Sequence, residues 1–511
     1  MPEFQLPHSL LDTCSDVLLQ ELTSDPWRKD FVTRKYWPPS IADIVLKSAL
    51  RRGQHASLTV LRRLFANPKN KNQWISPAIL SLNMSFQPLW FGDLMDLYGS
   101  LLSANISEMR TFGIAVRLFS IYDREQELIM HLAGMLCRVL DRMPVLTTLI
   151  LRGVSDDNML MGISESSSAG LLLHLDVSCS RGVSDDGIFA LTSNCHNLQI
   201  LNMSDTSVTG EGARNALQFL PKLKTIGGYV NMEHVSDVIL SLGEELPCFT
   251  EIYDNSLIHS QNVKLLNALC PNILKLVTHI HCLPAFDEFS FPHLETLKVD
   301  CDFKDHSDTV WDFLETREKS RAFKNLVLYN QMGSGLAIEA LKPVSHTLEG
   351  FEGKITYTYL PDDTVIPPFE KLQVLKLKKM ECVKSSKRMM QNCPNVERLA
   401  VEHCVWPYSS ILRDCPSVLD FQDVARSLRS GQFSFLQELW IESDATFGST
   451  NCLVQFIEFT CPVLRVLGYT VHIKGIKLQE LKNEIRNRNW SLDLVESPTY
   501  GKCRSWERTA S

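Results

Sequence analysis

The chain has 511 residues, a formal net charge of −8 and a pI of about 6.0. This acidic balance argues against a general nucleic-acid binder, because contacts to phosphates need clustered lysine and arginine. No apolar stretch reaches the roughly 18 residues that a membrane span requires. We therefore expect neither nucleic acid nor a membrane as a partner.

Many of the 15 cysteines recur beside proline or asparagine in a repeated context, as Cys195, Cys270, Cys393, Cys415 and Cys461 do. This placing favours reduced, buried thiols over a disulfide framework. The first residues also lack the basic segment and apolar run of a secretory signal. We expect a protein of the cytoplasm, the nucleus or both.

Residues 1–66 predict a small helical region. A first helix over 9–22 has apolar residues at helical spacing, and Pro26 ends it. A second helix begins at Pro38 and Pro39, because proline suits the first helical turn. A third helix covers 56–66, and the polar linker 67–73 follows it.

From residue 74 to 475 the chain repeats the pattern Leu-x-x-Leu-x-apolar. Clear copies begin at Leu146, Leu198, Leu294, Val396 and Leu464. Successive copies are mostly about 22 to 26 residues apart, which is typical of leucine-rich repeats. The pattern predicts an α/β leucine-rich-repeat solenoid, with parallel strands on the concave face and helices outside.

Several segments depart from this regularity. Residues 85–142 and 301–370 carry a weak or irregular repeat signal, although residues 79–84 resemble an early copy. The polar amphipathic segment 476–489 predicts a C-terminal capping helix, which a terminal repeat needs. We expect residues 490–511 to be a flexible tail.

No catalytic motif stands out. His279, His281 and Cys282 lie close together, but their spacing is too ragged for the paired ligands of a zinc site. They are better explained as ordinary residues at a strand edge. We expect a protein that is not an enzyme and that holds neither a metal nor another cofactor.

Strand alternation predicts which side chains face a partner. In each repeat, the positions flanking the second leucine point away from the core. Because these residues mix both charges with one aromatic ring, they suit a protein partner better than a polyanion. The predicted substrate surface comprises His174, Asp176, Asn202, Lys298, Lys376, Lys378, Arg398 and Trp440.

Two short motifs lie in the N-terminal helical region. Residues 9–18, SLLDTCSDVL, fit the elongin-C-binding box, and residues 37–45, WPPSIADIV, fit the cullin box. Their order ahead of leucine-rich repeats resembles the zyg-eleven-related substrate receptors of elongin/cullin-two ubiquitin ligases. The resemblance covers the two boxes and, loosely, the repeats to about residue 250.

The resemblance implies a non-catalytic receptor that holds a protein substrate on its repeats. Elongin C, with elongin B, would contact Leu10, Cys14 and Leu18. The cullin would contact Pro38, Ile41 and Val45. Family members also carry an armadillo-type domain after the repeats, whereas here Leu-x-x-Leu units continue to about Tyr469. The family's glycine-type degrons are therefore not carried over.

Two alternatives stay open. The pair Leu6-Pro7 resembles the opening of an F-box, which would bind a Skp-type adaptor instead of elongin C. The N-terminal helices could also cap the open end of a solenoid, because an uncovered first repeat leaves its core wet. In that case the chain would be an interaction scaffold with no role in ubiquitin ligation.

Overall fold

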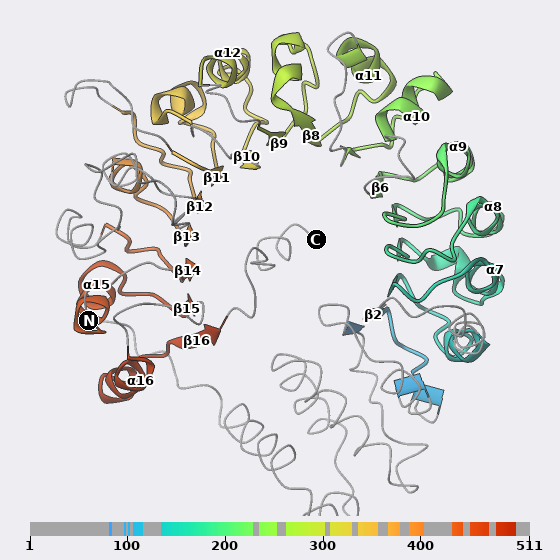
Figure 1. The fold of residues 1–511 in the computed structure, drawn as a ribbon, viewed down its shortest axis with the longest axis horizontal. Helices are drawn as coiled ribbons and strands as arrows, with labels where there is room; N and C mark the ends of the chain where they lie inside the picture. The colour runs from blue at the N-terminus through green and yellow to red at the C-terminus, as the bar shows by residue number, and fades with distance from the viewer. Residues whose placement is uncertain are drawn as a thin grey trace, which may run out of the picture. The chain divides into compact units, whose positions relative to one another are not determined.

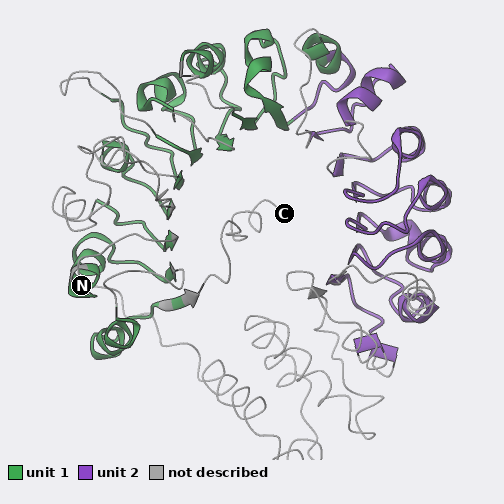
Figure 2. Ribbon diagram, viewed as in Figure 1, with its two compact units in different colours: residues 1–4, 256–267, 274–511 green, residues 5–255, 268–273 purple. Residues whose placement is uncertain are grey.

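We describe the fold from a computed structural model. The structure describes residues 81–83, 97–98, 101–102, 106–115, 134–227, 235–252, 262–301, 307–329, 336–355, 366–378, 388–402, 432–442, 450–469 and 477–496. The chain divides into two compact units (Figure 2). The N-terminal unit comprises residues 5–255 and 268–273, and the C-terminal unit comprises residues 1–4, 256–267 and 274–511.

In the N-terminal unit, each strand pairs in parallel with the next one in the chain. These strands are β1 (Ser81–Asn83), β2 (Thr111–Ala115), β3 (Thr148–Arg152), β4 (His174–Asp176), β5 (Ile200–Asn202), β6 (Thr225–Gly227) and β7 (Glu251–Ile252). The helices between them are α7 (Asp157–Glu165), η2 (Ala169–Leu171), α8 (Asp185–Thr192), α9 (Gly210–Phe219) and α10 (Val235–Leu242).

The C-terminal unit follows the same plan. Its strands are β8 (Lys275–His279), β9 (Thr296–Asp300), β10 (Asn325–Tyr329), β11 (Gly350–Gly353), β12 (Val374–Lys378), β13 (Arg398–Glu402), β14 (Glu438–Glu442), β15 (Val466–Tyr469) and β16 (Asp493–Glu496). Its helices are η4 (Ile280–Ala285), α12 (Ser307–Arg317), η5 (Ile338–Val344), α15 (Thr450–Thr460) and α16 (Leu478–Asn487). Residues of helix α11 (Val263–Leu269) belong to both units.

Within each unit the strands form a concave layer and the helices lie outside it (Figure 1). The predicted α/β leucine-rich-repeat fold is therefore confirmed. The predicted N-terminal helical region lies outside the described residues.

The second leucine of each repeat is the centre of the core. Leu149, Leu175 and Leu201 lie opposite one another in the sheet and are at most 1% exposed. Burying a leucine completely contributes about 1.5–3 kcal/mol relative to leaving it exposed. One strand cannot provide that burial alone, because its apolar face needs the neighbouring repeats on both sides.

Three strands lie in segments that carry little or no repeat signal in the sequence. β2 lies within the segment 85–142, and its second residue, Phe112, pairs with Leu149 of β3. β10 and β11 lie within the segment 301–370 and continue the ladder in register.

The predicted capping helix corresponds to α16, but it is not the last element of the ladder. Residues 493–496 were expected in the flexible tail, whereas they form β16 and pair with β15. The reason is local: Leu492 and Leu494 give this segment an apolar period of two residues, and Leu494 pairs with Leu467.

The helices of neighbouring repeats are joined through their first turns. Asp157, the first residue of α7, accepts hydrogen bonds at 2.7 Å from both the backbone N–H and the hydroxyl of Ser184, the N-cap of α8. Asp185, the first residue of α8, accepts from the N–H and hydroxyl of Thr209, the N-cap of α9, at 2.7 and 2.6 Å. Each carboxylate thus holds the start of the following helix.

A glycine stands beside each of these carboxylates. Gly187 and Gly212 occupy the third position of α8 and α9. A Cβ at either position would collide with the aspartate of the preceding repeat. The motif Ser/Thr-x-x-Gly therefore indicates both the start of a helix and its close approach to the helix of the preceding repeat.

The recurring cysteines lie in the core. Cys195, Cys270, Cys393 and Cys461 are free thiols that are at most 1% exposed. Burial disfavours their charged form and raises the pKa of Cys195 and Cys270 to about 12. These thiols therefore act as small apolar side chains and are poor nucleophiles.

We expect Asp185→Asn to lower the free energy of unfolding by about 1–3 kcal/mol, because it weakens charged hydrogen bonds to Thr209 and leaves a buried donor poorly paired. Urea denaturation followed by circular dichroism measures this change. The control is Asp186→Asn, which lies in the same first turn but is exposed. It should lose only the helix-dipole contribution, about 0.3–1 kcal/mol. Equal losses for the two variants would contradict a special role for Asp185.

Candidate functional site

The strand residues that point away from the leucine layer form a strand face on each unit. On the N-terminal strand face we consider Arg152, His174, Asp176, Ile200 and Asn202. The C-terminal strand face carries Lys298, Glu352, Lys376, Lys378, Arg398, Glu438 and Trp440. All eight residues predicted as a substrate surface belong to these two sets.

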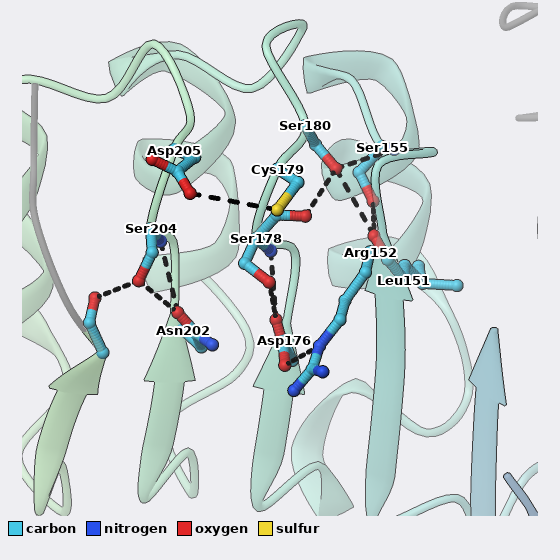
Figure 3. A network of polar contacts seen from close by, with 11 residues as sticks. Leu151, Arg152, Ser155, Asp176, Ser178, Cys179, Ser180, Asn202, Ser204 and Asp205 are labelled. Carbon is cyan, nitrogen blue, oxygen red and sulfur yellow. Dashed lines mark hydrogen bonds and ion pairs between the residues drawn. The ribbon is translucent and has the colours of Figure 1, made fainter. Parts of the chain in front are cut away.

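Asp176 and Arg152 form an ion pair on the N-terminal strand face (Figure 3). The Arg152 Nε–H donates to Asp176 Oδ2 at 2.7 Å. The other carboxylate oxygen, Oδ1, accepts from the backbone N–H and the hydroxyl of Ser178, at 3.0 and 2.6 Å. Both oxygens of Asp176 are therefore occupied within the chain.

This arrangement changes the role expected for Asp176. The sequence placed it on an open surface, whereas its residue is 1% exposed. The carboxylate supports Arg152, and it is Arg152 that reaches solvent, with a side chain 39% exposed. The sequence analysis missed Arg152, although strand alternation from Ile150 would have placed it on the same face.

Asn202 is held in a similar way by the turn that follows β5. Its Oδ1 accepts from the backbone N–H and the hydroxyl of Ser204, at 3.2 and 2.7 Å. Because a backbone N–H can only donate, this contact fixes which side of the amide faces the turn. The side chain also leans over Gly227 of β6, where a Cβ would collide with it.

His174 lies on β4 beside this network and is partly buried. Burial, which disfavours the charged ring, lowers the pKa of His174. Asp176 opposes this shift and Arg152 adds to it. The ring is therefore neutral at neutral pH.

Buried serines fix the turns behind β3 and β4 (Figure 3). The Ser180 hydroxyl accepts from the Ser155 N–H at 3.2 Å and donates to the Leu151 carbonyl at 3.4 Å. The Ser155 hydroxyl donates to the same carbonyl at 3.3 Å. These contacts connect two consecutive repeats at the turns that follow the strands carrying Arg152 and Asp176.

On the C-terminal strand face, opposite charges pair across neighbouring strands. Glu352 of β11 contacts Lys378 of β12 directly and lies 3.7 Å from Lys376 Nζ. Burial alone would raise the pKa of Glu352, but Lys378 and Lys376 outweigh burial, and the pKa is lowered. The Lys376 side chain is only 10% exposed, so its charge serves this pair more than a partner. Lys298 of β9 adds to the positive charge around Glu352.

Trp440 lies at the other end of this face. Its Nε1–H donates to Glu438 at 3.3 Å, and Glu438 also lies 3.7 Å from Arg398. The indole lies over Gly468 of β15, where a Cβ would collide with the ring. The glycine therefore leaves room for the indole against β15.

The histidine and cysteine cluster takes part in ordinary local contacts. The His281 N–H donates to His279 Nδ1 at 3.3 Å, and the rings lie 4.7 Å apart. Within the described ranges, no group of three or more potential ligands could hold a metal ion. None of the helices that the structure describes is long and apolar enough to cross a membrane.

The residues of the two predicted N-terminal boxes lie outside the described part of the chain. These residues are Leu10, Cys14, Leu18, Pro38, Ile41 and Val45. Their roles stay predictions from the sequence.

Comparison with known proteins gives distant likenesses to solved structures and no match to a family model or a curated protein. Among solved structures, the chain is similar to the crystal structure of the Rad7 and Elc1 complex in yeast. The identity is 11%, the alignment covers 96% of this chain and 98% of that chain, and the TM-score is 0.35. A likeness at that level identifies neither a family nor a partner for this chain.

The lowered pKa of His174 predicts a pH-dependent stability. As the pH falls below about 6.5, the unfolded chain takes up the proton before the folded chain does. Stability should therefore fall on acidification and level off below the folded pKa. His174→Gln should remove this part of the pH dependence, measured as urea midpoints between about pH 5 and pH 7.5. The exposed His196 is the control, and an equal change in His196→Gln would contradict the assignment.

Proposed function

We propose that this chain is the non-enzymatic substrate-recognition adaptor of a cullin-RING ubiquitin ligase. The observation that carries the proposal is the order of an elongin-type box, residues 9–18, and a cullin-type box, residues 37–45, ahead of leucine-rich repeats. Each box alone is a degenerate pattern, so the argument depends on their combination and order.

The boxes assign a contact to each apolar residue. Leu10 enters an apolar pocket of elongin C, and Cys14 and Leu18 pack beside it on the same helical face. Pro38, Ile41 and Val45 make the corresponding contact with the cullin, which we propose to be cullin-two. Elongin B joins through elongin C.

The strand faces support a role in holding a protein substrate. They present donors, acceptors and an aromatic ring at positions fixed by the sheet, which favours a specific partner. Bringing a substrate close to the charged ubiquitin carrier raises its effective concentration, so the adaptor itself needs no catalytic group. The buried free cysteines are compatible with our proposed site of action, the cytoplasm, the nucleus or both.

The first test separates elongin from Skp. Purified intact chain should capture elongin B/C, and Leu10→Ser with Cys14→Ser should weaken capture at least about tenfold, because burial of apolar contacts is lost. Leu11→Ser is the matched control, since Leu11 is outside the box pattern. Unchanged circular dichroism shows that the repeats stay folded. Capture of Skp in place of elongin would favour an F-box opened by Leu6-Pro7, and capture of neither would favour a scaffold without ligase.

The second test concerns the cullin. Ile41→Asp with Val45→Asp should abolish recruitment of cullin-two while elongin B/C capture is retained, because a charge cannot enter an apolar contact without a large desolvation cost. Size-exclusion chromatography of the mixed proteins measures both. Ala42→Asp, which adds a charge between the pattern positions, is the control. Recruitment that survives the double substitution would disprove the cullin box.

A further inference from the structure

We propose that Arg152 and Asn202, which we call the donor patch, bind an extended acidic segment of a protein partner. A side-chain carboxylate of that segment would take the Arg152 guanidinium, and a backbone carbonyl would take the Asn202 amide. This inference deepens the proposed function, on which it rests for the statement that the partner is the ligase substrate.

Arg152 is prepared for a carboxylate. Its Nε is bonded to the buried Asp176, and Figure 3 shows both Nη atoms on the far side from that bond. Among the described residues, no acceptor bonds to either Nη. The two Nη atoms form the fork that pairs with both oxygens of a carboxylate. Because Asp176 already restricts the guanidinium, less side-chain freedom is lost on binding.

Asn202 is prepared for a carbonyl. Ser204 occupies its Oδ1 with two hydrogen bonds, and Figure 3 shows Nδ2 on the side that faces β4. The amide therefore offers donors to a partner and keeps its acceptor for the turn. Asp176 follows the same rule, since Ser178 and Arg152 use both of its oxygens.

The donor patch therefore favours a partner that presents hydrogen-bond acceptors over one that presents donors. A basic side chain would find Asp176 buried and the Asn202 oxygen already accepting two hydrogen bonds, whereas a carboxylate or carbonyl would meet donors on two strands. A nucleic acid is disfavoured, because one arginine cannot replace the many cations that bind a phosphate chain. The complementary partner is an acidic peptide segment.

The strand spacing predicts the spacing of the peptide contacts. In the ladder, Ile150 of β3 lies level with Asp176 and Asn202, and Arg152 lies two residues further along β3. Because the Arg152 side chain reaches Asp176 of β4, its guanidinium lies between one and two strand spacings from Asn202, roughly 5–10 Å. An extended peptide that crosses the strands covers about 3.3 Å per residue, so about two or three residues separate its two contacts. Ile200 of β5 is 37% exposed and offers an apolar contact at that end.

The experiment is a selection of random dodecapeptides displayed on phage against the full chain. Enriched peptides should carry Asp or Glu with an apolar residue about two or three positions away. In fluorescence polarisation, replacing that acid by its amide should weaken binding at least about tenfold, since a charged bidentate hydrogen bond is lost. Binding should also weaken with added salt.

Two conservative variants test the patch itself. Arg152→Lys keeps the charge but loses the fork, and Asn202→Asp keeps the acceptor for Ser204 but replaces the outward donor with an acceptor. Both should weaken the enriched peptides at least about tenfold. Lys378→Gln on the C-terminal strand face is the control and should leave binding unchanged.

The outcomes separate this inference from the proposed function. No acidic enrichment, binding insensitive to both patch variants, or loss in Lys378→Gln alone would overturn the donor patch. The Leu10→Ser, Cys14→Ser variant should still bind the peptides. Elongin capture without peptide binding by the intact chain would disprove the patch and leave the adaptor role standing. Peptide binding that depends on the patch, without elongin capture, would disprove the adaptor role and leave the patch standing.

Discussion

The apolar residue at the second leucine position of each repeat is the constraint on which the rest of the structure depends. In β3, β4 and β5 this residue is Leu149, Leu175 and Leu201, and each lies opposite the next. A slip of one residue in any strand would turn its leucine outward and its charged residues into the core. The leucine ladder therefore decides which side chains reach the strand face, before any of them takes part in binding.

The helix side adds a second fixed point to each repeat. Asp157 holds the N-cap Ser184, and Asp185 holds the N-cap Thr209. Because strand and helix of consecutive repeats are both joined, the turns between them are held at both ends. Those turns supply the seryl groups that hold Asp176 and Asn202. The geometry of the strand face thus follows from contacts made elsewhere in the repeat.

The sequence predicts the regular part of this fold well, because leucines that recur at a fixed spacing indicate stacked leucine-rich repeats. The prediction misses strands in which another residue takes the leucine position, and strands that follow the expected cap. Phe112 takes the leucine position in β2, and β16 follows a helix that looked terminal. Both segments join the ladder by pairing with a neighbour, and pairing is not visible in a single segment.

The strand-face residues show the same limit more sharply. Alternation placed Asp176 and Lys376 on the correct face, but burial depends on what lies across the strands. Asp176 is covered because Arg152 arrives from the preceding repeat, 24 positions earlier in the chain. Lys376 is covered because it shares Glu352 with Lys378. Such partners come together only through the register of neighbouring strands. The sequence therefore predicts on which face a residue lies, but not whether that residue is buried.

The two strand faces consequently differ in the contacts that a bound partner must replace or can add. On the C-terminal face the charges are paired with one another, and a partner that separates them must replace each contact or leave a charge unsolvated. On the N-terminal face the internal contacts consume acceptors and leave donors, so a partner adds hydrogen bonds without breaking any. Under the proposed function, such a preformed surface needs only modest affinity, because the ligase supplies proximity once the substrate is held. Substrate choice would then rest on the geometry of a few donors that the leucine ladder positions.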